Sequence, residues 1–197
     1  IQVLPFIGCR RSDRRYRLFG REDEAGRDQF MDDLYAMVEQ LYNVTSLAVW
    51  VPFNEGWGQF DSLQVTQILW EMDDTRLVDH VSGWHDQGGG DFKSRHVYYR
   101  PVRMKHDKHR VLALSEFGGY SMPLAGHMSS EKEFGYRIYR DEKSFMDAYC
   151  ALFEKEVIPC FEKQALSATV YTQVSDVEDE VNGLLTYDRK VVKVDAD

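Results

Sequence analysis

The chain has 197 residues and a net charge of −9, and 43% of its residues are apolar, with a mean hydropathy of −0.49. The length suffices for one domain with a sizeable core, and the negative charge argues against nucleic acid or an anionic membrane as the main partner. No apolar run approaches the roughly 20 residues of a transmembrane helix. Three cysteines without CxxC spacing argue against a disulfide framework or zinc site and mildly favour a reducing, cytoplasmic location.

The first half of the chain predicts strands that alternate with helices. Residues 1–7 and the apolar run 47–53 are typical of strands. The segment between them predicts a helix, because its apolar residues recur at helical spacing: Phe30, Leu34, Met37, Val38 and Leu41. Asp61 is expected to cap a second helix that buries Val65, Ile68 and Leu69. Two further strands are predicted at 77–82 and 95–99.

The second half continues this alternation. A strand is predicted at 111–115, and a long polar excursion follows over 116–141. Ser144 is expected to cap a helix that Pro159 ends or bends, and the last clear strand is 168–173. Strands alternating with helices imply parallel crossover units. Because no linker interrupts the chain, residues 1–197 are interpreted as a single domain or a piece of one.

Polar and aromatic side chains follow the ends of the predicted strands. Asn54 and Glu55 follow the run 47–53, and Glu116 follows the strand at 111–115. The other strand ends carry Trp84, His85, Asp86, Tyr98 and Tyr99. In a parallel barrel all these ends open onto one face. Two carboxylates beside an amide, a tyrosine and tryptophans are the groups that cleave a glycosidic bond.

Three segments resemble the catalytic domain of glycoside hydrolase family 2, which includes β-galactosidases, β-glucuronidases and β-mannosidases. They are "NEGWGQF", "SEFGG" and "YTQVSDVEDEVNGLLTYDR". The resemblance implies an α/β fold of the (β/α)8 TIM-barrel type and retaining hydrolysis of β-glycosides, with no cofactor and no metal. It assigns Glu55 as acid/base and Glu116 as nucleophile. Asn54 would bind the sugar's 2-hydroxyl, and Tyr98, or Tyr99 if the alignment slips by one, would lie beside the nucleophile.

The chain also departs from this family. Only five or six strands are predicted, and no β-sandwich or immunoglobulin-like domain precedes them. The sequence is therefore interpreted as the C-terminal part of a catalytic barrel, from strand three or four to strand eight. A barrel broken in this way leaves an open edge and an exposed apolar face. We therefore expect self-association through the incomplete side, and little activity of this chain alone.

Several assignments have simpler interpretations. Trp57, Trp84 and Asp86 are candidate substrate contacts, but a tryptophan can equally belong to the core and a carboxylate to a surface ion pair. Asp176 and Glu178 are a weaker candidate pair for a divalent ion. A second function remains open: an inactive carbohydrate-binding or structural remnant of a glycosidase. A metal-dependent hydrolase would need a His/Asp ligand set at strand ends, for which only scattered residues are present.

Overall fold

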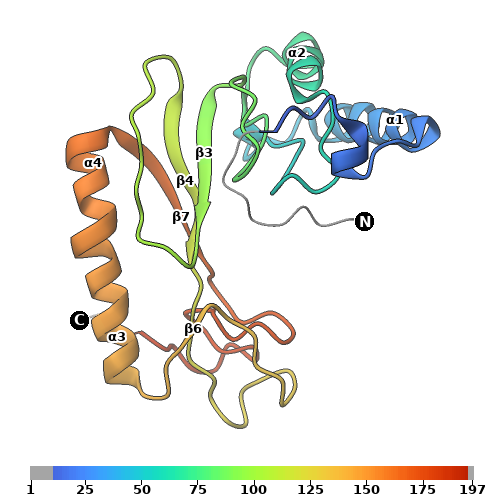
Figure 1. The fold of residues 1–197 in the computed structure, drawn as a ribbon. Coiled ribbons are helices and arrows are strands. Elements are labelled where there is room, and N and C mark those ends of the chain that lie inside the picture. The colour runs from blue at the N-terminus through green and yellow to red at the C-terminus, as the bar shows by residue number, and fades with distance from the viewer. Residues whose placement is uncertain (1–10, 195–197) are drawn as a thin grey trace. The chain divides into compact units, whose positions relative to one another are not determined.

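The computed structural model describes residues 11–194 (Figure 1), so the strand predicted at 1–7 lies outside the described residues. The chain divides into two compact units. Unit 1 takes the chain up to His96 together with Asp107–Ala113, and unit 2 takes Val97–His106 and the chain from Leu114 onward. Among the described residues, no helix combines the length and the apolar character needed to cross a membrane.

Unit 1 contains a short 3-10 helix, η1 (Tyr16–Phe19), and two α-helices, α1 (Glu24–Leu41) and α2 (Ser62–Met72). The helix predicted from apolar spacing is α1, whose buried residues are Leu34 and Val38. The core of this unit is a cluster of nine buried residues: Leu34, Val38, Trp50, Phe53, Phe60, Val65, Leu69, Val78 and Val81. Burying a side chain of this size contributes about 1.5–3 kcal/mol.

Helix α2 connects two short parallel strands, β1 (Val49–Trp50) and β2 (Leu77–Val78). The expected parallel crossover is therefore present, with Val49 opposite Leu77 and Trp50 opposite Val78. Both strands are much shorter than predicted. Pro52 lacks the backbone N–H that a longer ladder would use at that position.

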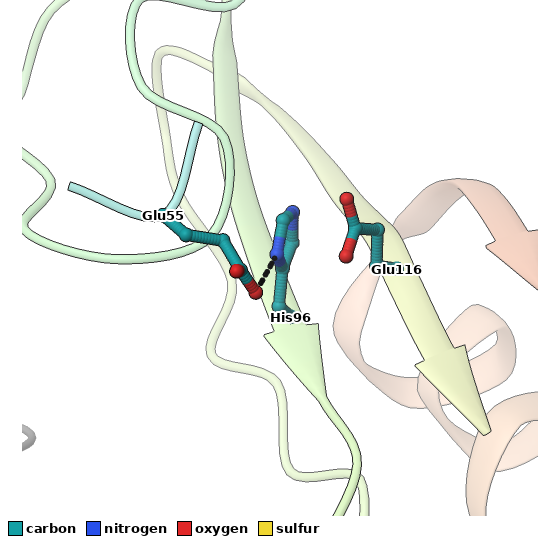
Figure 2. A group of neighbouring side chains, drawn as sticks. All are labelled: Glu55, His96 and Glu116. Atoms are coloured by element: carbon teal, nitrogen blue, oxygen red, sulfur yellow. Dashed lines mark hydrogen bonds and ion pairs between the residues drawn. The ribbon is translucent and has the colours of Figure 1, made fainter. Parts of the chain in front are cut away.

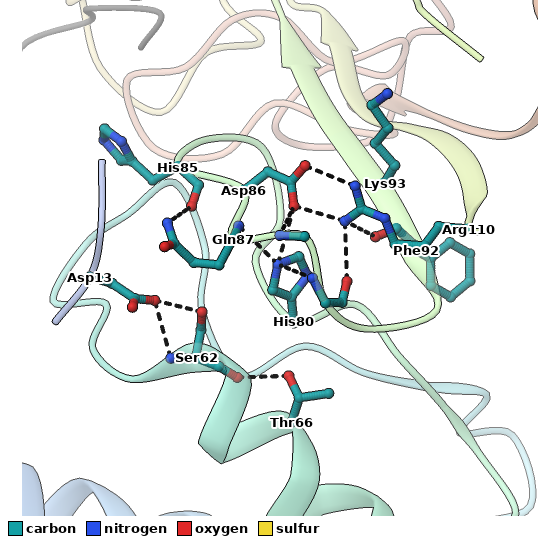
Figure 3. Close-up of polar contacts among 12 residues, drawn as sticks. Asp13, Ser62, Thr66, His80, His85, Asp86, Gln87, Phe92, Lys93 and Arg110 are labelled. Carbon is teal, nitrogen blue, oxygen red and sulfur yellow. Dashed lines mark hydrogen bonds and ion pairs between the residues drawn. The ribbon is translucent and has the colours of Figure 1, made fainter. Parts of the chain in front are cut away.

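Asp13 and Asp73 hold the two ends of α2, although the sequence singled out neither of them. Asp61 precedes the helix but makes no side-chain cap bond, and its carboxylate instead accepts a hydrogen bond from the Tyr16 hydroxyl over 2.5 Å. Asp13 takes the capping role, because its carboxylate accepts from the Ser62 backbone N–H over 3.1 Å (Figure 3). At the other end, the buried Asp73 accepts hydrogen bonds from the Trp50 indole and the Arg76 guanidinium.

A second sheet has three strands in the order β3–β4–β7: β3 (Phe92–Val97), β4 (Val111–Gly118) and β7 (Leu166–Thr172). These match the strands predicted at 95–99, 111–115 and 168–173, with boundaries shifted by up to three residues. A third sheet pairs β5 (Tyr120–Ser121) with β6 (Arg137–Ile138) in parallel, inside the region predicted as a polar excursion.

The helices of unit 2 follow one another without a break. They are α3 (Glu142–Leu152), the π-helical segment η2 (Phe153–Val157) and α4 (Ile158–Gln164). Asp141 is the N-cap, and its carboxylate accepts from the Ser144 N–H over 2.8 Å; the predicted cap at Ser144 was wrong. Pro159 follows directly after the π-helical segment η2 and does not end the helix, because α4 continues to Gln164.

These helices pack on the sheet through aromatic side chains. Phe117 of β4 contacts Phe153, and Tyr171 of β7 contacts Phe117, Tyr149 and Phe153, all with ring centroids 5.1–6.3 Å apart. Phe117 and Phe145 are fully buried. The aromatic side chains on the buried face of the helices therefore form the core of unit 2 together with those of the sheet.

The expected (β/α)8 barrel is wrong. In residues 11–194 the strands form three separate sheets of two, three and two strands, and none of them closes into a barrel. Alternating strands and helices predict parallel pairs, but closure depends on ladders long enough to join every pair to the next. Here two of the three sheets consist of a single ladder that ends after two residues. The predicted self-association rested on an incomplete barrel. Because the described part of the chain forms no barrel, self-association stays a prediction that the fold does not support.

Candidate active site

Glu55 follows β1 at a sharp turn of the backbone in unit 1. Its φ of 54° lies in the left-handed region, which is uncommon for a residue other than glycine. The turn is fixed from both sides: Asn54 bridges Ser82 in parallel, and the Glu55 N–H donates to the Ser82 carbonyl over 2.8 Å. A residue held in this conformation by its neighbours is a feature often found at functional sites.

The Glu55 carboxylate is paired with His96 of β3, as Figure 2 shows. Glu55 Oε1 lies 2.9 Å from His96 Nδ1, and His96 Nε2 lies 2.8 Å from the Ser82 hydroxyl. The His96 side chain is 0% exposed, whereas that of Glu55 is 20% exposed. The imidazole therefore fixes the carboxylate from the buried side, and Ser82 in turn orients the imidazole.

Glu116, also labelled in Figure 2, belongs to β4 in unit 2 and has a tyrosine as its partner. The Tyr98 hydroxyl donates to Glu116 Oε2 over 2.6 Å and lies 3.1 Å from the Thr172 hydroxyl. Burial and the hydrogen bond to Glu116 raise the pKa of Tyr98 well above its ordinary value of 10.0. Tyr98 is therefore a neutral hydrogen-bond donor at physiological pH, and its hydroxyl orients the Glu116 carboxylate.

The other residues proposed from the sequence lie in varied surroundings. Asn54 is exposed, and Trp57 beside it is 45% exposed. Trp84 is half-buried. Asp86 forms a bidentate pair with Arg110, with N–O distances of 2.7 and 2.9 Å (Figure 3).

Asp86 also anchors its own loop. Its Oδ1 accepts from the Gly88 N–H over 2.8 Å and lies 3.3 Å from His80 Nε2. Burial would raise the pKa of Asp86, but the hydrogen bonds from His80 and Arg110 outweigh it and hold the pKa below its usual value. This carboxylate therefore acts as a fixed negative charge beside the three consecutive glycines of residues 88–90. A contact between Asp86 and substrate stays a prediction.

Asp176, considered above as part of an ion site, has a structural partner. Lys193 Nζ lies 2.7 and 2.8 Å from its two carboxylate oxygens, and the Gly183 N–H donates to it over 2.8 Å. Both side chains of this ion pair are almost fully buried. The pair fastens the C-terminal segment to the loop before it.

Three residues that hold the two glutamates were missed from the sequence. They are His96, Ser82 and Thr172. Only His96 had a usable signal, since it stands two positions before Tyr98 in "RHVYY" and alternate strand residues share a face. Ser82 and Thr172 carry no distinguishing pattern.

No family model matches this chain, and no curated protein matches it. Among solved structures, the fold is similar to part of an FMN-binding β-glucuronidase from Facaelibacterium prausnitzii L2-6, with 18% sequence identity and a TM-score of 0.56. The match covers 87% of this chain and 31% of that one. At this identity the likeness concerns the fold alone: the chain has a fold similar to about a third of a glycosidase.

Proposed function

We propose that this chain hydrolyses β-glycosides with retention, as the resemblance to glycoside hydrolase family 2 implies. Glu55 is the acid/base, Glu116 is the nucleophile, and Asn54 binds the sugar's 2-hydroxyl. Trp57 and Trp84 offer aromatic faces to the substrate, and Asp86 is a further candidate contact. The observation that carries the proposal is that each glutamate is held by a hydrogen-bonding partner, and that the two partners, His96 and Tyr98, are almost adjacent in the chain.

The partners also suit the two different roles. The hydrogen bond from neutral Tyr98 orients Glu116, whose oxygen attacks the anomeric carbon while the glycosidic C–O bond breaks. Glu55 gives its proton to the leaving oxygen and then takes one from the water that hydrolyses the glycosyl ester. His96 holds Glu55 in place for both steps, because its Nδ1 pairs with the carboxylate and its Nε2 with the Ser82 hydroxyl.

The proposal is tested by turnover of aryl β-glycosides whose leaving groups differ in acidity, using galactosides, glucuronides and mannosides. Glu116→Gln should abolish turnover of every substrate. Glu55→Gln should cost about 10²–10⁴-fold on poor leaving groups, which need protonation, and much less on activated ones. The exposed Glu131→Gln serves as the matched control and should leave both rates unchanged.

Two results would contradict these roles. Equal losses for Glu55→Gln on activated and unactivated substrates would rule out the acid/base assignment. Turnover that survives Glu116→Gln would rule out the nucleophile. Binding of a sugar without turnover by the wild-type chain would instead favour the carbohydrate-binding alternative.

A further inference from the structure

Tyr98 is held in place by a second tyrosine from a distant part of unit 2. The ring of Tyr136 stacks on that of Tyr98, with centroids 4.0 Å apart and an angle of 7° between the planes. Tyr99 and Phe134 contact the Tyr136 ring edge-on, at 4.8 and 5.8 Å. Tyr136 therefore lies at the centre of a cluster of four aromatic rings, of which Tyr98 donates to Glu116.

The backbone around Tyr136 is arranged for this stack. The Tyr136 N–H donates to the Gly119 carbonyl over 3.3 Å, just before the parallel pairing of β5 with β6. Gly119 itself has a φ of 61°, and a Cβ at this position would collide with the Tyr136 ring and come within 3.1 Å of Tyr98. The absence of a side chain at Gly119 thus leaves the space in which the two rings meet, three residues after Glu116.

The stack controls the direction of a short hydrogen bond. The Tyr98 hydroxyl reaches both Glu116 and Thr172, and the ring can rotate about its side-chain bonds unless its faces are occupied. Stacked aromatic pairs have a preferred geometry and a measurable stabilisation of their own. Packing of the Tyr136 ring therefore sets where the Tyr98 hydroxyl points.

We propose that Tyr136 is a positioning residue, whose ring holds the Tyr98 hydroxyl against the carboxylate of Glu116. The effect of Tyr136 on catalysis rests on the proposed function. The hydrogen bonding of the Tyr98 hydroxyl, however, can be measured without turnover. It predicts that a flat ring is required at position 136, whereas the Tyr136 hydroxyl is not.

The test uses the full chain with ¹³Cζ-labelled tyrosine, whose shift responds to hydrogen bonding of the hydroxyl. Of the 11 tyrosine signals, that of Tyr98 is identified by its loss in Tyr98→Phe. Tyr136→Met, which keeps the bulk but not the flat ring, should move the Tyr98 signal toward the position of exposed tyrosines. Tyr136→Phe should leave it in place. Tyr136→Leu is a second variant in case Tyr136→Met does not fold.

The matched control is Tyr139→Leu, since Tyr139 is a half-buried tyrosine that packs on Tyr120 and Phe145 instead. It should leave the Tyr98 signal unchanged. With a β-glycoside, Tyr136→Met should lower kcat about three- to tenfold with KM changed less than about twofold, and Tyr136→Phe should restore kcat.

The outcomes separate the two proposals. A Tyr98 signal that stays in place in Tyr136→Met and Tyr136→Leu overturns the positioning role, whatever the activity. A signal that moves while the wild-type chain hydrolyses no glycoside supports the positioning role and counts against the proposed function alone.

Discussion

The Tyr98 hydroxyl donates a 2.6 Å hydrogen bond to the carboxylate of Glu116, and its pKa is raised by burial and by this same bond. A buried phenol that stays neutral can act only as a donor toward a carboxylate. The pair therefore fixes the orientation of the Glu116 carboxylate. Glu55 is paired instead with the imidazole of His96.

Removal of the Tyr98 hydroxyl tests the first of these statements. Tyr98→Phe keeps the ring that stacks on Tyr136 but loses the bond to Glu116. A hydrogen bond to a charged group contributes about 1.5–3 kcal/mol, so kcat should fall about 10–100-fold. The melting temperature should change little. Tyr187→Phe is the control, because Tyr187 is 47% exposed, and a loss of similar size in that variant would contradict the account.

Removal of the His96 imidazole should affect kcat in the same way as the loss of an acid/base residue. His96→Ala should lower kcat about tenfold or more on poor leaving groups and far less on activated ones, because only the former need protonation. Ser82→Ala should have a smaller effect of the same kind, since Ser82 acts through His96. Steady-state rates on a series of aryl glycosides measure this. A loss that does not depend on the leaving group would show that His96 serves only the packing of unit 1.

The helices and the candidate glutamates could be predicted from the sequence because their signals are local. Apolar spacing marks α1, and a carboxylate directly after an apolar run marks Glu55. Asp61 stands at the predicted N-cap position of α2, but the carboxylate that accepts from the Ser62 N–H is that of Asp13, 49 positions away. Such a contact depends on how distant segments meet.

Whether the strands close into a barrel could not be predicted from local patterns, for the same reason. The parallel pairing of β1 with β2 follows from a strand–helix–strand pattern, but closure of a sheet is a property of all its strands together. His96 lies inside the strand predicted at 95–99. Its pairing with Glu55 depends on β3 lying against the turn after β1, which the residue pattern does not encode.

Acid should weaken unit 1 through Asp73. Burial would raise the pKa of this carboxyl, but hydrogen bonds from Thr75, Trp50 and Arg76 outweigh burial and hold it well below its usual 3.8. The unfolded chain therefore binds this proton more readily, so the stability that Asp73 contributes is complete above about pH 4–5 and is lost as the pH falls below 3.8. All four tryptophans belong to unit 1, so their fluorescence follows its unfolding in urea.

The variant Asp73→Asn checks this assignment. At pH 7 it should lower the free energy of unfolding of unit 1 by about 3–5 kcal/mol, because Arg76 and the Trp50 indole lose a charged acceptor. Its stability should also fall less steeply with acid than that of the wild type. The neighbouring exposed Asp74→Asn should change neither quantity. If the free energy of unfolding falls equally steeply with acid in wild type and Asp73→Asn, other carboxyls cause the loss of stability.

The most direct test of the central claim is to trap the covalent intermediate. A 2-deoxy-2-fluoro-β-glycosyl fluoride of each candidate sugar is incubated with the chain, which is then digested and analysed by mass spectrometry. If Glu116 is the nucleophile, its oxygen displaces fluoride from the anomeric carbon, and the peptide containing Glu116 gains the mass of one fluorosugar. Glu116→Gln should remain unlabelled, and Glu55→Gln should still be labelled, because fluoride needs no protonation to leave. A label on Glu55 or on any other carboxylate would contradict the account, and so would hydrolysis of aryl glycosides without any labelled peptide.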